Sequence, residues 1–270
     1  MYALDFEYDG QRLSDHGFVI CNFGGGTSNF DTVSAGSKIT FNKVSRNRGA
    51  VCSLTGTKYE ECITTTFTIC KDPTSNDDLL INGAECRTLM RWLNRREFLR
   101  FCFLDDQERE TYYYNASFNV NKIMVNRELF GLELTMEADR PFALGPTVKE
   151  SWTVSNTALP YILNDVCDEV GSICPTVKIT CLEAGTMTLH NSMGDVTTVI
   201  KNCTQNEVIT IHGDTQIIET SMNSHKLYRD FNFEFFRIGN TIGSRSNSIT
   251  ASIKCNIELS YDPIIKNSPF

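Results

Sequence analysis

Residues Asn82–Leu104, with the sequence NGAECRTLMRWLNRREFLRFCFL, place an amphipathic helix directly before a strongly apolar strand. One helical stripe carries apolar side chains at positions i, i+3, i+4 and i+7, namely Cys86, Leu89, Met90 and Leu93. Asn82 is a good helix cap, and Glu85 stands three residues later, where it completes a capping box. We therefore expect one helix over residues 82–95.

The strand that follows, residues 98–104, carries apolar side chains on both faces, and only Arg100 interrupts them. Because successive strand residues point to opposite sides of a sheet, both sides of this strand need cover. We expect the helix to cover one side and a second sheet to cover the other. The alternating segments 112–120 and 130–138 are predicted to be antiparallel strands that flank the central one.

An alternating strand at residues 37–44 lies between two long polar segments, 26–36 and 45–50. A strand between two such connections is expected to project as an arm and not to lie in the core. The next apolar alternation extends from Tyr59 to Ile69, and we expect it to be one long strand.

The first half closes at Arg140-Pro141-Phe142, and Gly145-Pro146 is typical of a domain boundary. From residue 146 onward, short apolar segments alternate with turn residues, which favours a β-sandwich of the jelly-roll kind. The candidate strands there are 149–155, 176–182, 185–191, 195–200, 207–212, 215–220, 229–237 and 248–259. The fold is thus predicted to be mainly β. It has an N-terminal β-sandwich at residues 1–142 with one α-helix packed on it, and a second sandwich at 146–270.

Composition and charge exclude several classes of protein. The chain has 270 residues, of which 41% are hydrophobic and 21% charged, as in an ordinary globular protein. A net charge of −8 argues against a protein that binds the DNA backbone, because such a protein needs a basic face. The first residues have no secretion signal, and no apolar run is long enough to cross a bilayer. We expect synthesis in a cytoplasm and no membrane partner.

Eleven cysteines and four histidines raise the question of a metal site or a disulfide scaffold. No Cys-x-x-Cys occurs, and the histidines have no ligand-like spacing. Several cysteines occupy strand positions in which a small buried hydrophobe fits. We interpret them as reduced thiols, and expect neither a metal nor a cofactor.

Motifs of catalysis are missing from the sequence, which has no nucleophile elbow, no zinc-protease helix and no Walker loop. A glycosidase carboxylate pair stays open, because such pairs meet only in the folded chain. Trp92 is predicted to pack beside the helix stripe. Trp152 is equally consistent with packing at a hinge and with stacking on a ligand. His190-Asn191 is the only hint of lectin chemistry.

Several segments, in this order and spacing, resemble the distal tail proteins (Dit) of long-tailed, siphovirus-like bacteriophages. The resemblance spans most of the chain, although each segment consists of common strand and turn residues. The cysteine content departs from the family. The segments are Phe6-x-Tyr8-Asp9-Gly10, Leu13–Gly17, Leu89–Leu93, Phe98–Phe101, Leu132–Phe142, Cys174–Ile179, Phe235–Ile242 and Ile257–Tyr261.

The resemblance implies a hub protein of the tail tip or baseplate, with a galectin-like second sandwich. Members of the family form a hexameric ring that joins the tail tube protein to tail-tip, lysin-like and receptor-binding proteins. DNA passes through the ring without specific binding, and an acidic surface suits such a channel because like charges repel. The protein is then expected in the virion, at the tail tip, after assembly in the cytoplasm of the bacterial host.

Under this reading the arm bridges neighbouring subunits, and its polar side chains form the candidate interface. The alternatives are a carbohydrate-binding protein that recognises glycans of the host surface and a hydrolase with a carboxylate pair. No catalytic, cofactor or metal residue is assigned. The predicted subunit-interface residues are Lys38, Thr40, Asn42, Arg46 and Arg48.

Overall fold

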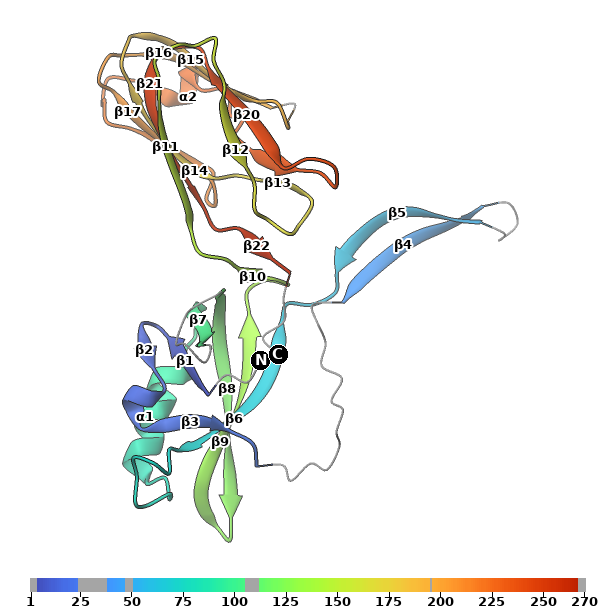
Figure 1. Cartoon of the computed structure of the whole chain (residues 1–270), viewed down its shortest axis with the longest axis vertical. Helices are drawn as coiled ribbons and strands as arrows, with labels where there is room; N and C mark the ends of the chain where they lie inside the picture. The colour runs from blue at the N-terminus through green and yellow to red at the C-terminus, as the bar shows by residue number, and fades with distance from the viewer. Residues whose placement is uncertain (1–3, 24–37, 47–50, 105–111, 195, 267–270) are drawn as a thin grey trace. The chain divides into compact units, whose positions relative to one another are not determined.

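The chain divides into two compact units in the computed structural model (Figure 1). The first unit holds Met1–Gly145 with Ile265–Phe270, and the second holds Pro146–Ile264. The predicted domains, a ring-forming one at 1–142 and a galectin-like one at 146–270, stay a prediction. The structure describes residues 4–23, 38–46, 51–104, 112–194 and 196–266.

Seven strands of the first unit form one sheet, in which every neighbouring pair is antiparallel. Apolar residues alternate along these strands, so one face of the sheet is apolar. The order across the sheet is β2 (Gln11–Arg12), β1 (Asp5–Tyr8), β7 (Leu99–Leu104), β8 (Tyr114–Val125), β9 (Glu128–Ala138), β6 (Thr64–Lys71) and β3 (Phe18–Cys21). The central strand β7 lies between β1 and β8. The expectation that the segment 130–138 flanks β7 is therefore wrong, because β9 pairs with β8 and β6.

The sheet of the first unit curls back on itself. The amide of Ile20 in β3 donates to the carbonyl of Leu4, just before β1, at 3.0 Å, although the two strands stand near opposite ends of the strand order. The curl encloses an aromatic core, in which the ring of Phe101 lies 5.3 Å from that of Phe6 and 5.1 Å from that of Phe118. One continuous curled sheet thus provides both faces of the predicted N-terminal sandwich.

Helix α1 (Gly83–Leu93) begins where the sequence predicts and ends two residues earlier than expected. Asn82 accepts hydrogen bonds from the amides of Ala84 and Glu85, and Glu85 accepts one from the amide of Asn82, which completes the capping box. Its buried face contributes Cys86, Leu89, Trp92 and Leu93 to the core of the first unit.

The two faces of β7 enter different clusters. Phe101 and Phe103 belong to the main core together with the helix, whereas Cys102 and Leu104 pack with Tyr113 and Leu144 in a small separate cluster. The helix therefore covers one side as predicted. The other side packs against Tyr113 and Leu144, and the strand that supplies Leu144, β10 (Ala143–Leu144), belongs to a separate two-stranded sheet. A short strand is thus enough to bury these two side chains, where a larger sheet was expected.

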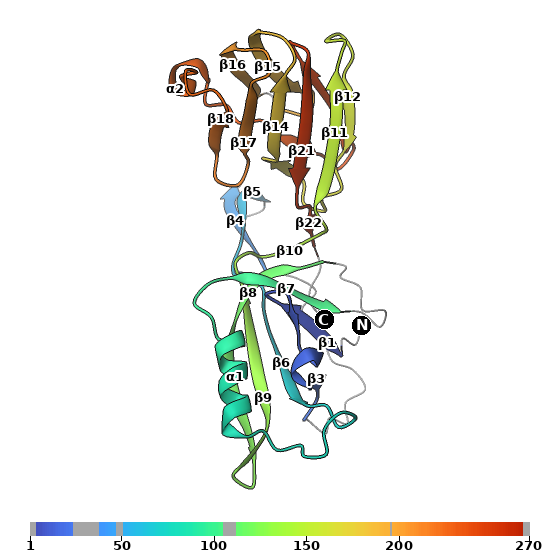
Figure 2. The ribbon, with the colours of Figure 1, turned by 90° about the vertical axis from the view of Figure 1, so that its left-hand side faces the viewer.

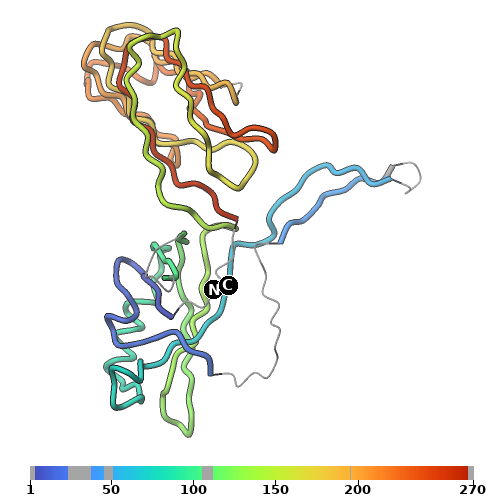
Figure 3. The backbone as a smooth tube through the Cα atoms, viewed as in Figure 1, coloured from blue at the N-terminus to red at the C-terminus, as the bar shows by residue number. Residues whose placement is uncertain are grey.

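Strands β4 (Ile39–Arg46) and β5 (Val51–Tyr59) pair only with each other and form an arm, which Figures 1 and 3 show as a two-stranded ribbon. The projecting arm agrees with the sequence prediction for residues 37–44. The prediction of a single long strand from Tyr59 to Ile69 is wrong, because β5 ends at Tyr59 and β6 begins at Thr64.

The second unit is a β-sandwich. Figure 2 shows β17, β14, β21 and β11 side by side. One sheet consists of β11 (Val148–Val154), β21 (Cys255–Tyr261), β14 (Thr176–Cys181), β17 (Val208–His212) and β18 (Ile217–Thr220). The other consists of β12 (Tyr161–Asn164), β20 (Ser246–Ala251), β15 (Gly185–Asn191) and β16 (Thr197–Cys203). A separate pair is formed by β13 (Gly171–Ile173) and β19 (Ile238–Asn240), and the last strand is β22 (Ile264–Ile265).

Alternate residues of both sheets fill one core, which includes Val177, Ile179, Leu189, Ile249 and Ile257. The mainly β fold with two sandwich-type units is thereby confirmed. The strand predicted at 229–237 is wrong: that segment holds a short helix, α2 (Leu227–Asp230), and an irregular stretch after it.

Candidate subunit interface

The arm exposes apolar side chains that have no core to enter. None of its described residues is buried. A bulge in the pairing, after Asn42, puts one extra residue into β5, so Ile39, Phe41 and Leu54 share one face of the ribbon. Their exposed fractions are 39%, 54% and 57%. Burying such side chains is favourable, so this face is suited to a partner surface.

Polar contacts and one aromatic pair hold the base of the arm. Lys38 forms an ion pair with Glu60 at 2.8 Å, and the hydroxyl of Thr40 donates to the same carboxylate. The hydrogen bond with Glu60 raises the pKa of Lys38, and the bond from Lys38 lowers the pKa of Glu60. The ring of Tyr59 meets that of Phe142 edge-on at 6.4 Å. These contacts fix the root of the ribbon and leave its outer part free.

The predicted interface residues lie on the arm but mostly not on its apolar face. Lys38 and Thr40 are bound to Glu60 at the base, and Asn42 stands at the bulge. Arg46 ends β4, and Arg48 lies outside the described residues. Thr40 and Asn42 point to the face opposite Phe41, because strand residues alternate.

Sequence reasoning missed the second strand of the arm and the role of the apolar residues. The sequence prediction gave the subunit contact to polar residues of the arm and gave no role to Ile39 and Phe41. In a two-stranded ribbon both faces are open, so the apolar side chains of the arm stay exposed. The residues of the second strand, 51–59, show no regular apolar alternation that could have revealed it.

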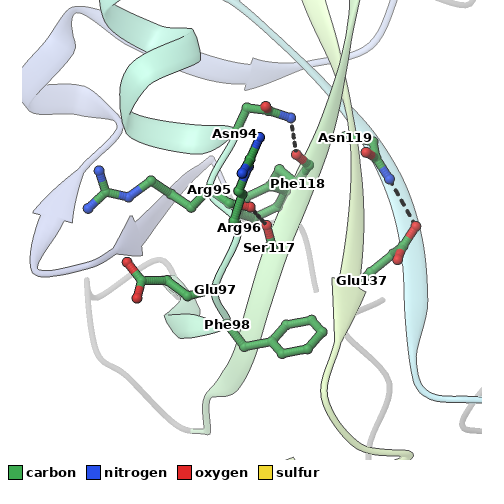
Figure 4. A pocket seen from close by; sticks show the side chains of 9 residues that line it. All are labelled: Asn94, Arg95, Arg96, Glu97, Phe98, Ser117, Phe118, Asn119 and Glu137. Carbon is green, nitrogen blue, oxygen red and sulfur yellow. Dashed lines mark hydrogen bonds between the residues drawn. The ribbon is translucent and has the colours of Figure 1, made fainter.

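A surface hollow of about 150 Å³ lies between the end of α1 and strands β8 and β9 (Figure 4). Its polar side chains are engaged in structural bonds: Asn94 donates to the carbonyl of Phe118 at 2.9 Å, and Asn119 donates to Glu137 at 2.9 Å. Ser117 likewise donates to the carbonyl of Arg95 at 2.6 Å. These bonds fasten the helix end to the sheet, and the hollow pairs no nucleophile with a general base.

Metal ligands do not come together in the part of the chain that the structure describes: no three His, Cys, Asp or Glu side chains are placed to hold an ion. No described helix is long and apolar enough to cross a membrane.

The side chains that hinted at sugar binding form hydrogen bonds and packing contacts within the second unit. Asn191 is buried and donates to Asn247 at 2.7 Å, and His190 contacts the hydroxyl of Thr197 at 3.1 Å. Trp152 stacks on Tyr161 with ring centroids 4.1 Å apart, and it packs against the sandwich core. Packing therefore accounts for Trp152, and Trp92 packs in the first core as predicted.

Glu207 and His225 form a buried ionic pair in the second unit. Glu207 is fully buried and accepts hydrogen bonds from Nδ1 of His225 at 2.5 Å and from the amide of Thr204 at 2.8 Å. Burial alone raises the pKa of Glu207, but the bonds from Thr220 and His225 outweigh it and hold this pKa below its ordinary value. The pair ties the segment before α2 to β17 and β18.

Sequence comparison places both units in known families. A family described as "Phage tail protein N-terminal domain" matches residues 1–140, and one described as "Phage tail C-terminal domain" matches residues 142–261. The chain belongs to a family of phage tail proteins. No curated protein matches the sequence of this tail protein.

The fold resembles that of a solved phage protein. The Dit (gp 19.1) protein of phage SPP1, described as a paradigm of hub adsorption apparatus in phages that infect Gram-positive bacteria, is 11% identical with a TM-score of 0.68. The match covers 97% of this chain and 99% of the SPP1 chain. A chain of the phage P2 baseplate in its activated conformation with Ca is 10% identical over 96% of this chain and 98% of that chain, with a TM-score of 0.49.

These relationships confirm the resemblance to distal tail proteins. The tail protein is a component of the virion tail, and its fold is that of a tail hub protein.

Proposed function

We propose that this tail protein forms a hexameric ring at the tail tip, in which the arm of each subunit lies on its neighbour. The observation that carries the proposal is the arm, a ribbon of two strands with a solvent-exposed apolar face. An isolated two-stranded ribbon is at best marginally stable in water, so burial of Ile39, Phe41 and Leu54 against another subunit stabilises it.

A ring needs a head-to-tail interface that closes, and an arm suits this geometry. In such an interface one surface of each subunit meets a different surface of the next. An arm that leaves its own subunit supplies the first surface. The SPP1 hub protein supports this proposal by its common fold.

The outward face of the first sheet is our candidate for the wall of the DNA channel. Along β8 and β9 it presents Asn119, Asn121, Glu133 and Glu137, and each carboxylate accepts a hydrogen bond from one of these amides. Threonines of β6 and β9 continue the same face, with Thr66 3.2 Å from Thr135. Along β8 and β9 the charged groups of this hydrophilic face are the two carboxylates, which repel phosphate and let DNA slide.

The ring joins the tail tube protein to the tail-tip, lysin-like and receptor-binding proteins. Assembly takes place in the cytoplasm of the bacterial host, before the particle is released. The domain at residues 1–142 builds the ring, and the domain at 146–270, of galectin-like form, faces the tip proteins.

Light scattering and negative-stain microscopy of the purified protein test self-assembly. We expect rings whose mass is six times that of the 30.5 kDa subunit. A ring of another size would correct the copy number. A single 30.5 kDa species at every concentration and salt would contradict assembly by the protein alone.

A further inference from the structure

The arm is a basic segment in an acidic chain. Residues 38–59 hold five Lys or Arg side chains and no Asp or Glu, and two glutamates, Glu60 and Glu61, follow directly at the root. Together with these two glutamates the segment has a net charge of +3. The rest of the chain holds 20 basic and 31 acidic residues, which is a net charge of −11. The arm therefore differs in the sign of its charge from the chain that carries it.

The glutamates at the root balance the basic side chains nearest to them. Lys38 forms its ion pair with Glu60 at 2.8 Å. The pKa of Glu60 is held below its ordinary value first by the hydrogen bond from Lys38 and also by the nearby charge of Lys58. The net positive charge of the segment therefore comes from its three remaining basic residues, which are Lys43, Arg46 and Arg48.

One of these three cations stands on the apolar face of the arm. Lys43 is the direct cross-strand partner of Leu54, and it is two residues from Phe41 in β4, so it shares their face. Its Nζ lies 5.8 Å from the ring centroid of Phe41, and the side chain is exposed. The face thus combines apolar side chains with a positive charge. A surface that complements it combines apolar side chains with carboxylates.

A second copy of this chain offers both kinds of group. Besides its net negative charge, the first unit exposes Leu79 and Phe98 by 41% and 51% outside the arm, and each follows an exposed acidic residue, Asp78 and Glu97. A DNA backbone, in contrast, offers phosphates to Lys43 but no apolar surface for the rest of the face. The combination of charge and apolar surface therefore favours a second copy over DNA as the occupant.

We propose that the arm binds an acidic surface of the next copy of this chain, and that Lys43 lies against a carboxylate of that copy. The inference rests on the proposed function, to which it adds the charge of the neighbour's surface and the residue that recognises it. Outside their arms, two neighbouring copies repel each other, because each has a net charge of −11 there. The arm offsets this repulsion at the contact and favours the acidic neighbour over a basic one.

A matched pair of charge reversals tests the electrostatic part. Salt alone does not, because it screens both the attraction of the arm and the repulsion between the copies. Lys43→Glu and Lys149→Glu change the net charge equally, and Lys149 is exposed on β11 of the second unit. In sedimentation at 0.1 M salt, Lys43→Glu should associate about tenfold more weakly than Lys149→Glu. The difference should shrink at 1 M salt, where the Debye length falls from about 10 Å to about 3 Å.

Carbodiimide coupling in assembled tails identifies the partner of Lys43. The reagent joins an amine to a carboxylate when the two groups are in contact. Lys38 and Glu60, 2.8 Å apart within one chain, are the internal positive control. Peptide mapping of the covalent dimer should find Lys43 linked to an Asp or Glu of a second copy. Lys43→Arg keeps the charge but cannot be coupled, so this variant should assemble and lose the link.

Three results would overturn the proposal. The first is coupling of Lys43 to another tail protein only, or no coupling of Lys43 where Lys38 is coupled to Glu60. The second is binding of a short DNA duplex by the purified chain at 0.1 M salt that is lost in Lys43→Glu. The third is equal association of Lys43→Glu and Lys149→Glu at 0.1 M salt. Light scattering of the wild type reports the ring separately: rings with equal variants remove this inference alone, whereas a monomer at every concentration contradicts self-assembly.

Discussion

Phe41 is the residue on which the role of the arm depends most. It is 54% exposed, and its cross-strand partner, Thr57, gives it no apolar cover. We expect Phe41→Ser to weaken subunit association by roughly 2 kcal/mol for each arm, or about 30-fold, because the buried ring is lost from the interface. Sedimentation of the full chain over a range of concentrations measures this change.

Asn42→Ser is the matched control for this variant. Asn42 stands next to Phe41 in β4 but points to the opposite face of the ribbon. Its replacement should leave association nearly unchanged, and neither variant should shift the unfolding temperature of the monomer. If Asn42→Ser dissociates the assembly and Phe41→Ser does not, the polar residues predicted from the sequence form the interface.

His225 gives the second unit a dependence on pH. Burial opposes the charged imidazole, but the bond to Glu207 overcomes this effect and raises the pKa of His225 above its ordinary 6.5. A raised folded-state pKa stabilises the fold fully below the unfolded value, and this contribution is lost as the pH rises through the folded value. Asp230 of α2, 3.5 Å from Nε2, faces the same ring.

We therefore expect the second unit to lose on the order of 1 kcal/mol of stability as the pH rises above 6.5. In His225→Gln this loss should disappear, and stability at pH 6 should be lower than in the wild type. Urea unfolding can be followed by the fluorescence of Trp152 in a Trp92→Phe background. Equal pH profiles for the two proteins would show that the Glu207–His225 pair does not titrate in this way.

At the scale of elements, the helix boundary is the feature that local chemistry determines most directly. Asn82→Ala removes both cap bonds to the amides of Ala84 and Glu85 and should cost about 1 kcal/mol of unfolding free energy. Arg87→Ala, an exposed change on the same helix, is the control and should be nearly neutral. Denaturation followed by Trp92 fluorescence measures both, and equal values would refute the role of the cap.

Elements with a clear periodic face could be predicted from the sequence. α1 and β7 followed from their apolar spacing, since packing against one core imposes that spacing. The strand predicted at 229–237 failed because its apolar residues do not alternate between a core and solvent: Phe231 and Phe236 are buried, whereas Phe233 is exposed at a positive φ of 59°. The conformation of such a segment depends on the long-range contacts of each aromatic ring. The local sequence pattern carries no information about these contacts.

The candidate site was predicted in part for a related reason. The arm itself followed from a strand between polar connections. Its apolar face did not, because the sequence alone does not show that β4 has only β5 beside it and that both faces of the ribbon stay open. Which strands pair depends on the fold of the whole chain. The same pairing determines which apolar face stays exposed to solvent.

At the scale of the whole molecule, the channel proposal predicts an effect on DNA passage. Replacing Glu133 and Glu137 by Gln removes two carboxylates from each subunit and should slow DNA ejection from the particle, because repulsion of the phosphates is reduced. Glu234→Gln in the second unit is the control, since Glu234 is exposed and lies outside the sheet of the first unit. Ejection kinetics that match the wild type would remove this face from the channel wall.

Photo-crosslinking in assembled tails tests the central claim most directly. A photoreactive benzoylphenylalanine replaces Phe41 in one preparation and Tyr228, which is 63% exposed on α2, in the control. Irradiation of tails with the Phe41 replacement should give a ladder of covalently joined copies of this protein that ends at six, and the control should give none. Tails in which position 41 links to no other copy of the chain would contradict the account.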